Sequence, residues 1–326
     1  MKRRAFIAAC GGAAAWTLAG HAQQSDRMRR VGVLIAFAEN HPFAQAFVAA
    51  FSGALRSPGW VEGKNIRTDY RFAAGDPALF KAYAAELIGL GPDALLASTA
   101  PALAALQQQT HTIPIVFVVV PDPVGRGLVT SLARPGGNIT GFASYDASII
   151  GKWVQLLKEV VLEVTRASVI FNPDTALAPP LDRVMEASPS TGVTVTLAPV
   201  HDDAGIEAAA AAQSREPGGG LVILPDSFNV THSHVIVAAA IRYKLPSIGF
   251  TELVRAGCLM SYWYDAIELH AKAASYIDRI LRGASPADLP IQYPTKYSLI
   301  INLKTAKALG LTVPPAMLDL ADEVIE

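Results

Sequence analysis

The run Arg30-Val31-Gly32-Val33-Leu34-Ile35-Ala36-Phe37 carries no polar or charged side chain after its first residue. A continuous apolar run of this length indicates a strand buried on both faces, as in a parallel sheet. The segment 42–55 follows with helical periodicity, and Pro42 suits the first turn of a helix. Because a buried strand leading into a helix is the unit of an α/β fold, we predict that the folded chain begins with this unit.

The same unit repeats along the chain. We predict strands at 66–72, 93–97 and 113–120, and helices at 77–90 and 100–109. After a Pro- and Gly-containing break at 133–138, an extended segment at 139–144 leads to a helix at 151–161. A second α/β set then follows, with strands at 167–171, 193–198, 220–224 and 246–250 and helices at 204–213 and 235–243. Two such sets predict two doubly wound, Rossmann-like lobes.

The C-terminal part does not complete a third set. It contains a long amphipathic helix at 266–282, a Pro-containing connector at 285–294, a strand at 297–303 and a helix at 305–309. This leftover segment suggests a chain that crosses between the lobes three times. We therefore expect an N-terminal lobe of residues 28–145 plus about 265–293 and a C-terminal lobe of residues 146–264 plus about 294–326.

The first 22 residues have the three parts of a secretory signal peptide. Basic residues Lys2-Arg3-Arg4 precede an apolar stretch at 5–18, and Gly20-His21-Ala22 offers small residues at the cleavage positions. Arg3-Arg4 also partly matches a twin-arginine signal, so both export routes stay open. Cys10 lies too early for a lipoprotein site, and removal of the leader leaves Cys258 alone, which we interpret as a buried apolar side chain. We expect a periplasmic protein.

Composition and motifs exclude several classes of function. The 326 residues carry a formal net charge of -1, which does not indicate a nucleic-acid partner. No glycine fingerprint, phosphate-binding loop, metal-ligand spacing or Gly-x-Ser-x-Gly elbow occurs, so we predict no cofactor, no metal and no catalytic residues. The seven histidines are scattered, and we interpret them as solvated surface residues.

Polar residues at the carboxyl ends of predicted strands are the best candidates for a binding site, because ligands of open α/β sheets bind there. Ser98 and Thr99 follow the strand at 93–97 and open a helix. They suit a carboxylate, or they only cap the helix. Asp122 follows the next strand and could accept an ammonium group or only shape a turn.

The second predicted lobe offers acidic and aromatic candidates. Asp226 and Ser227 end the strand at 220–224, Phe250 ends the next one, and Tyr262 and Trp263 follow the last. Aromatic side chains in a cleft would stack on an apolar or aromatic ligand, and the alternative for Phe250 and Trp263 is packing in the core. The set of predicted ligand-binding residues is completed by Phe37 and Tyr145.

Several stretches resemble a known protein family. The most specific is Ser131-Leu132-Ala133-Arg134-Pro135-Gly136-Gly137-Asn138-Ile139-Thr140-Gly141, and others lie at 58–66, 113–117, 122–125, 287–290, 294–296, 301–311 and 321–326. They resemble the ABC transporter substrate-binding family that includes bacterial tryptophan-binding lipoproteins. The sequence departs from the family pattern at two positions: it has Ser98 and Trp263 where the family often has Gly.

This resemblance implies a type I periplasmic binding fold with a three-segment hinge, and an ABC permease with its ATPase as partners. It also implies a small-molecule ligand, since some members bind aromatic amino acids. We expect a monomer that captures an amino acid or aromatic solute by lobe closure. Ser98 and Thr99 would take the carboxylate, Asp122 or Asp226 the ammonium, and the aromatic candidates the side chain. The alternatives are an exported ligand sensor for a membrane receptor and, with no nucleophile and base in its sequence, an exported α/β enzyme.

Overall fold

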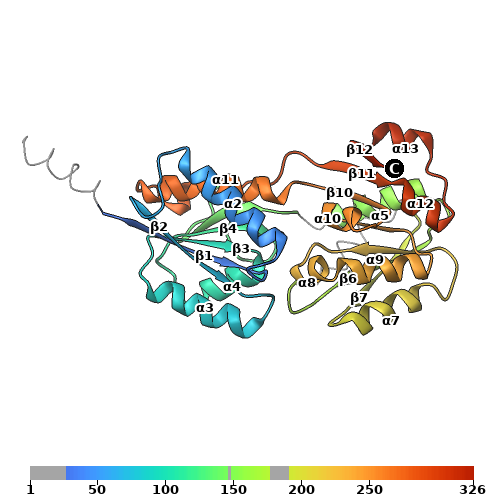
Figure 1. Ribbon diagram of the computed structural model, residues 1–326, viewed down its shortest axis with the longest axis horizontal. Helices are drawn as coiled ribbons and strands as arrows, with labels where there is room; N and C mark the ends of the chain where they lie inside the picture. The colour runs from blue at the N-terminus through green and yellow to red at the C-terminus, as the bar shows by residue number, and fades with distance from the viewer. Residues whose placement is uncertain (1–26, 146–147, 177–190) are drawn as a thin grey trace, which may run out of the picture.

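The computed structural model describes residues 27–145, 148–176 and 191–326, and it consists of two α/β lobes side by side (Figure 1). The predicted leader at 1–22, with Cys10, lies outside the described residues. In the part of the chain that is described, no helix is long and apolar enough to cross a membrane.

A five-stranded parallel sheet forms the centre of the first lobe, with the strand order β2-β1-β3-β4-β5. Its strands are β1 (Arg29–Ile35), β2 (Ile66–Phe72), β3 (Ala94–Ser98), β4 (Ile115–Val120) and β5 (Ile139–Ala143). Helix α2 (Pro42–Arg56) covers one face, and α3 (Pro77–Gly89) and α4 (Ala100–Gln107) cover the other. Val33 and Leu34 point into these two separate cores, which explains why the run at 30–37 is apolar throughout.

A seven-stranded sheet forms the centre of the second lobe, in the order β12-β11-β10-β9-β8-β6-β7. Its strands are β6 (Arg166–Phe171), β7 (Thr194–Pro199), β8 (Gly219–Ile223), β9 (Ser247–Gly249), β10 (Met260–Trp263), β11 (Ser298–Asn302) and β12 (Glu323–Ile325). Only the β10–β11 pair is antiparallel among the described strands. The helices of this lobe are α5 (Ser148–Val160), α7 (Asp203–Gln213), α8 (Ser227–Thr231), α9 (Ser233–Arg242), α10 (Thr251–Arg255), α12 (Leu303–Leu309) and α13 (Pro315–Leu320).

The chain passes between the lobes at three places. It leaves the first sheet after β5, returns after β10, and leaves again before β11. The helix between the last two passages, α11 (Ala266–Leu281), packs on α2 and β4 of the first lobe, as its position in Figure 1 shows. Trp60, which follows α2, donates a 2.8 Å hydrogen bond to Asp278 of α11. We therefore propose the lobe boundaries 28–145 plus about 265–293 and 146–264 plus about 294–326.

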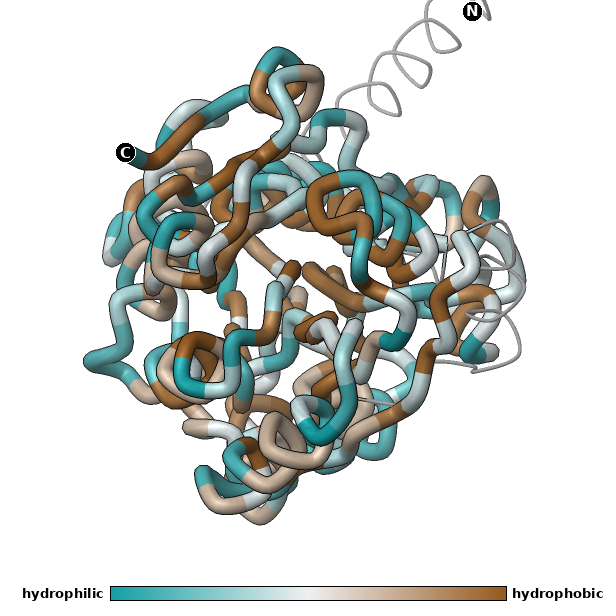
Figure 2. Tube along the Cα trace, turned by 90° about the vertical axis from the view of Figure 1, so that its right-hand side faces the viewer, coloured by the Kyte–Doolittle hydropathy of each residue, from teal (hydrophilic) through white to brown (hydrophobic). Residues whose placement is uncertain are grey.

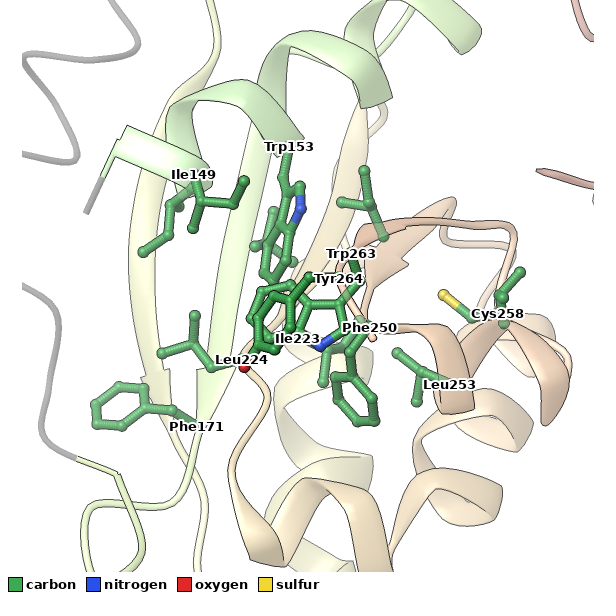
Figure 3. Packing of buried hydrophobic residues seen from close by; sticks show 14 of the residues in the cluster. Ile149, Trp153, Phe171, Ile223, Leu224, Phe250, Leu253, Cys258, Trp263 and Tyr264 are labelled. Carbon is green, nitrogen blue, oxygen red and sulfur yellow. The ribbon is translucent and has the colours of Figure 1, made fainter. Parts of the chain in front are cut away.

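Apolar residues concentrate on the strands and on the inner faces of the helices. In Figure 2 the segments at the centre of the view are largely brown, whereas the outer segments mix teal, pale and brown. In the second lobe, Trp153 and Trp263 pack with their ring centroids 5.5 Å apart, above Phe250 and Leu253 (Figure 3). Cys258 lies at the edge of this cluster and is 1% exposed, as the sequence predicts for an apolar cysteine. Burial raises the pKa of its thiol to about 11, so the thiol stays protonated.

The sequence analysis did not predict strand β10, nor the short elements α8, α10, α13 and β12. Helices α8 and α10 have five residues each, which is less than two turns. A segment of this length is too short to develop a helical period in its sequence. Both begin directly after strands of the second sheet, so they place further residues at the edge where a site is expected.

Candidate functional site

A cavity lies between the lobes, and we call it the hinge cavity; together with the open solvent at its mouth it encloses about 450 Å³. The first lobe lines it with Phe37, Phe43, Phe47, Ser98, Thr99 and Val119. The second lobe adds residues 225–227, 230, 250 and 252, and the passage from β10 to α11 adds Trp263, Tyr264 and Ala266. The carboxyl ends of strands from both sheets therefore meet at one place.

A second cavity of about 680 Å³ adjoins the first and shares Phe37 and Ser227 with it. The first lobe contributes His41 and the turn at Ala74-Gly75, and the second lobe contributes residues 172, 174, 175 and 232. No residue of the passage from β10 to α11 lines this cavity. It is thus the part of the cleft that lies away from the hinge.

Seven of the ten predicted ligand-binding residues line the hinge cavity. They are Phe37, Ser98, Thr99, Asp226, Ser227, Phe250 and Trp263. Asp122, Tyr145 and Tyr262 line neither of these two cavities. Tyr145 packs edge-on against Trp263 with the ring centroids 5.4 Å apart, and Tyr262 stacks on Tyr297 at 5.4 Å. Asp122 accepts a 2.9 Å hydrogen bond from the backbone N–H of Gly125, which stabilises the turn after β4.

The first lobe presents strained backbone to the cavity. Thr99 has φ +91° and Val119 has φ +59°, both in a region that β-branched residues rarely adopt. Such strain costs about 1–3 kcal/mol per residue and is typical of ligand-binding sites. Thr99 precedes α4 without capping it, and its buried hydroxyl has no hydrogen-bond partner among the described residues. This hydroxyl is therefore available to a ligand.

The hydroxyl of Ser98 is engaged by a buried histidine. Ser98 Oγ lies 2.9 Å from His270 Nε2, and His270 Nδ1 lies 2.8 Å from the carbonyl oxygen of Ala266. Because a carbonyl oxygen only accepts, Nδ1 carries the imidazole proton and Ser98 donates to Nε2. His270 is 2% exposed and stacks on Phe47 at 3.8 Å. The prediction that the histidines are solvated is therefore wrong for His270, which faces inward from α11.

This serine–histidine pair is suited to a structural role. Burial lowers the pKa of His270 to about 4, so the ring is neutral at physiological pH and a weak base. Its Nδ1 is bonded to a carbonyl oxygen and not to a carboxylate, and this bond together with the charge of Asp265 offsets only part of the decrease in pKa. The pair instead ties α11 to the end of β3.

Asp226 caps α8 and uses both carboxylate oxygens within the protein. Oδ1 accepts from Asn229 N at 2.7 Å and from Thr175 Oγ1 at 3.2 Å. Oδ2 accepts from Asn172 N and from Asn229 Nδ2, both at 3.1 Å. Burial raises the pKa of Asp226 to about 6, and these hydrogen bonds offset part of the increase. Asp226 therefore joins the loop after β6 to the loop after β8, with little acceptor capacity left.

Glu252, in the first turn of α10, is a cavity residue that the sequence analysis missed. Burial, together with the nearby negative charge of Asp265, raises the pKa of Glu252 to about 7. Its own backbone N–H and the more distant Arg255 oppose this increase. The signal in the sequence was a carboxyl group two residues beyond Phe250, at the end of a predicted strand.

Among the described residues, no group of three or more His, Cys, Asp or Glu side chains could hold a metal ion. The hinge cavity is instead lined mainly by aromatic and aliphatic side chains, with a few polar groups at fixed positions. This combination is typical of sites for small organic molecules.

Known proteins share this architecture. Residues 31–325 match the family model for ABC transporter substrate binding proteins. A tyrosine-binding protein of Clostridioides difficile is 26% identical over 291 residues, which are 89% of this chain and 84% of that protein. The crystal structure of a conserved domain protein from Vibrio cholerae has a TM-score of 0.83 and 31% identity, covering 91% of this chain and all of that one. An ABC domain from Streptococcus pneumoniae in complex with L-Trp has a TM-score of 0.82 and 23% identity, covering 92% of this chain and all of that one.

Proposed function

Because the chain belongs to the family of ABC transporter substrate binding proteins, we propose that it captures an amino acid, preferably an aromatic one, for an ABC importer. The ligand occupies the hinge cavity. The protein acts in the periplasm as a monomer and delivers the ligand to a permease that is powered by an ATPase. Catalysis has no part in this function.

The observation that carries this proposal is that both lobes and the β10–α11 passage line one cavity. A ligand held there makes its full set of contacts only when the lobes are together. Its binding free energy therefore favours the closed arrangement over an open one. Because the passages between the lobes are few, rotation of one lobe against the other is the motion we expect.

Two observations support an aromatic amino acid as the ligand. Phe43, Phe47, Phe250 and Trp263 give the cavity walls on which an aromatic ring can stack. In addition, the relative from Clostridioides difficile is named for tyrosine binding, and the pneumococcal structure contains L-Trp. Thr99, with its unpartnered hydroxyl beside the first turn of α4, is suited to the carboxylate.

Calorimetry on the purified mature protein tests this proposal. The panel contains the 20 common L-amino acids and a set of aromatic carboxylic acids. We expect an aromatic L-amino acid to bind with a Kd of about 1 µM or below, together with a decrease in the radius of gyration in small-angle scattering. Absence of binding in both sets would rule out the ligand class. Binding without compaction would rule out lobe closure.

Import is distinguished from sensing in cells. If the protein feeds a permease, deletion of its gene should abolish uptake of the radiolabelled ligand, and reintroduction of the gene should restore it. Unchanged uptake in the deletion strain would favour delivery to a membrane receptor, which can use the same cleft.

A further inference from the structure

The carboxylate of Glu252 lines the hinge cavity on the side of the second lobe and has no ionic partner. Within the described part of the chain, its side chain forms no salt bridge of 4 Å or less. The nearest cation on its own helix, Arg255, pairs with both carboxylate oxygens of Glu323. Asp265, at the start of α11, adds a second negative charge nearby. Glu252 thus faces a largely apolar cavity as an unmatched acid.

An unmatched carboxylate in such surroundings is costly. Removal of a charge from water without a partner disfavours the ionised form and raises the pKa of the group, which is the direction of the shift at Glu252. The position of Glu252 in the first turn of α10 and its own backbone N–H offset only part of this cost. A ligand cation in the cavity would supply the missing partner, and the faces of the neighbouring aromatic rings would favour the same positive charge.

The other acid of the hinge cavity, Asp226, does not compete for this role. Each oxygen of Asp226 already accepts two hydrogen bonds within the protein. Glu252 interacts only with the backbone N–H of its own residue, and so it retains most of the acceptor capacity that an ammonium group with three N–H donors requires.

We propose that Glu252 is the ammonium-binding residue of the hinge cavity, and that the ligand is therefore a primary amine with an apolar or aromatic body, such as an aromatic α-amino acid. This inference rests on the proposed function and adds the group that selects the ligand class. A neutral or purely anionic aromatic solute would leave the carboxylate of Glu252 unpaired and would bind poorly.

Calorimetry with matched probes tests the assignment. The probes are L-tyrosine and L-tryptophan, the acids that lack the amine, 3-(4-hydroxyphenyl)propionate and indole-3-propionate, and the amines that lack the carboxylate, tyramine and tryptamine. We expect the wild-type protein to bind an amino acid at least about 30-fold more tightly than the matching acid. Glu252→Gln should weaken amino-acid binding by about 30-fold or more, whereas binding of the acid should stay the same or become tighter, because the like charge is removed. Glu268→Gln, an exposed change on α11, should keep wild-type affinities.

The stability of the variant separates recognition from structure. Glu252→Gln removes a charge that is partly buried and has no ionic partner, so its unfolding temperature without ligand should equal or exceed that of the wild-type protein. Glu252→Asp, which keeps the charge, should bind the amino acid better than Glu252→Gln does.

The outcomes distinguish this inference from the proposed function. Wild-type affinity in Glu252→Gln, equal binding of acid and amino acid, or a clear loss of stability in Glu252→Gln overturns the role of Glu252 and leaves solute binding intact. A wild-type protein that binds none of the six probes overturns both the inference and the proposed ligand class.

Discussion

Ser98 Oγ and His270 Nε2 lie 2.9 Å apart, although 172 positions separate the two residues in the chain. Ser98 ends β3 of the first lobe, and His270 lies on α11, which the chain reaches only after building most of the second lobe. The hydrogen bond therefore fixes the helix next to the hinge against the sheet that lines the cavity.

We predict that Ser98→Ala destabilises the protein without removing the site. The substitution leaves the buried Nε2 of His270 without its donor, which should lower the free energy of unfolding by about 1–2 kcal/mol. Ligand affinity should change by less than about threefold, because the hydroxyl proton is used within the protein. Urea unfolding and calorimetry measure the two effects. Ser275→Ala, at an exposed position of α11, is the control, and a large loss of affinity in Ser98→Ala alone would show that the hydroxyl binds the ligand.

His270 should also make the stability depend on pH. Its pKa falls from 6.5 in the unfolded chain to about 4 in the folded protein, so unfolding takes up a proton between these values. The stabilisation is present above pH 6.5 and is lost as the pH falls towards 4. Asp226 and Glu252 have raised pKa values, so their contribution to the stability increases as the pH falls. The pH dependence of the wild-type protein alone therefore does not report on His270.

Comparison with His270→Gln isolates the histidine. The stability advantage of the wild-type protein over this variant should shrink between pH 7 and pH 4.5, measured by urea unfolding at both values. An advantage that stays constant over this range would show that His270 titrates normally or does not contribute.

Asp226→Asn should have the opposite effect on stability to Glu252→Gln, although both changes neutralise an acid with a raised pKa at the same cavity. An amide nitrogen at position 226 would meet N–H donors where an oxygen now accepts two hydrogen bonds. We expect the free energy of unfolding to fall by about 2–3 kcal/mol. Thermal unfolding measures it, with the exposed Asp319→Asn as the control. An increase in stability would show that burial of the charge outweighs its hydrogen bonds.

Ligand affinity should rise with pH if Glu252 binds an ammonium group. The free protein holds Glu252 with a pKa of about 7, raised by burial and by Asp265 and opposed by Arg255. A bound cation lowers that pKa, so binding near neutral pH releases a proton. Calorimetry at pH 6 and pH 8, in two buffers that differ in ionisation enthalpy, should show tighter binding at pH 8 and a buffer-dependent enthalpy. Glu252→Gln should abolish both effects, and their persistence would assign the proton to another group.

The sequence predicted the first sheet and most of the second because a strand buried on both faces records its surroundings in its own residues, as the run at 30–37 does. Strands β10 and β12 of the second sheet were not predicted. The sequence also placed Thr99 and Phe250 at strand ends, where the hinge cavity lies. The contact of Ser98 with His270 could not be predicted, since it joins a strand and a helix that are distant in sequence. The hydrogen bonds of Asp226 could not be predicted for the same reason, because its donors include Asn172 and Thr175 from another loop.

Trp263 lies at the boundary between the hinge cavity and the core of the second lobe. Its ring lines the hinge cavity and also packs on Trp153 at 5.5 Å and on Tyr264 at 4.3 Å. The family resemblance implies glycine at this position, and we therefore expect the indole ring of Trp263 to reduce the space in the cavity. The side chain of Trp263 should therefore set the largest aromatic ligand that fits.

We predict that Trp263→Phe shifts the preference from L-tyrosine towards L-tryptophan. The smaller ring frees volume for a larger ligand, and the ratio of the Kd for tyrosine to that for tryptophan should rise by about tenfold. Lost packing against Trp153 should lower the free energy of unfolding by about 1–3 kcal/mol, which thermal unfolding monitors. Trp60→Phe is the control, because Trp60 donates a hydrogen bond to Asp278 and does not line the cavity. This variant should leave the ratio unchanged. An unaltered ratio in Trp263→Phe would mean that Trp263 serves the core alone and that other residues limit ligand size.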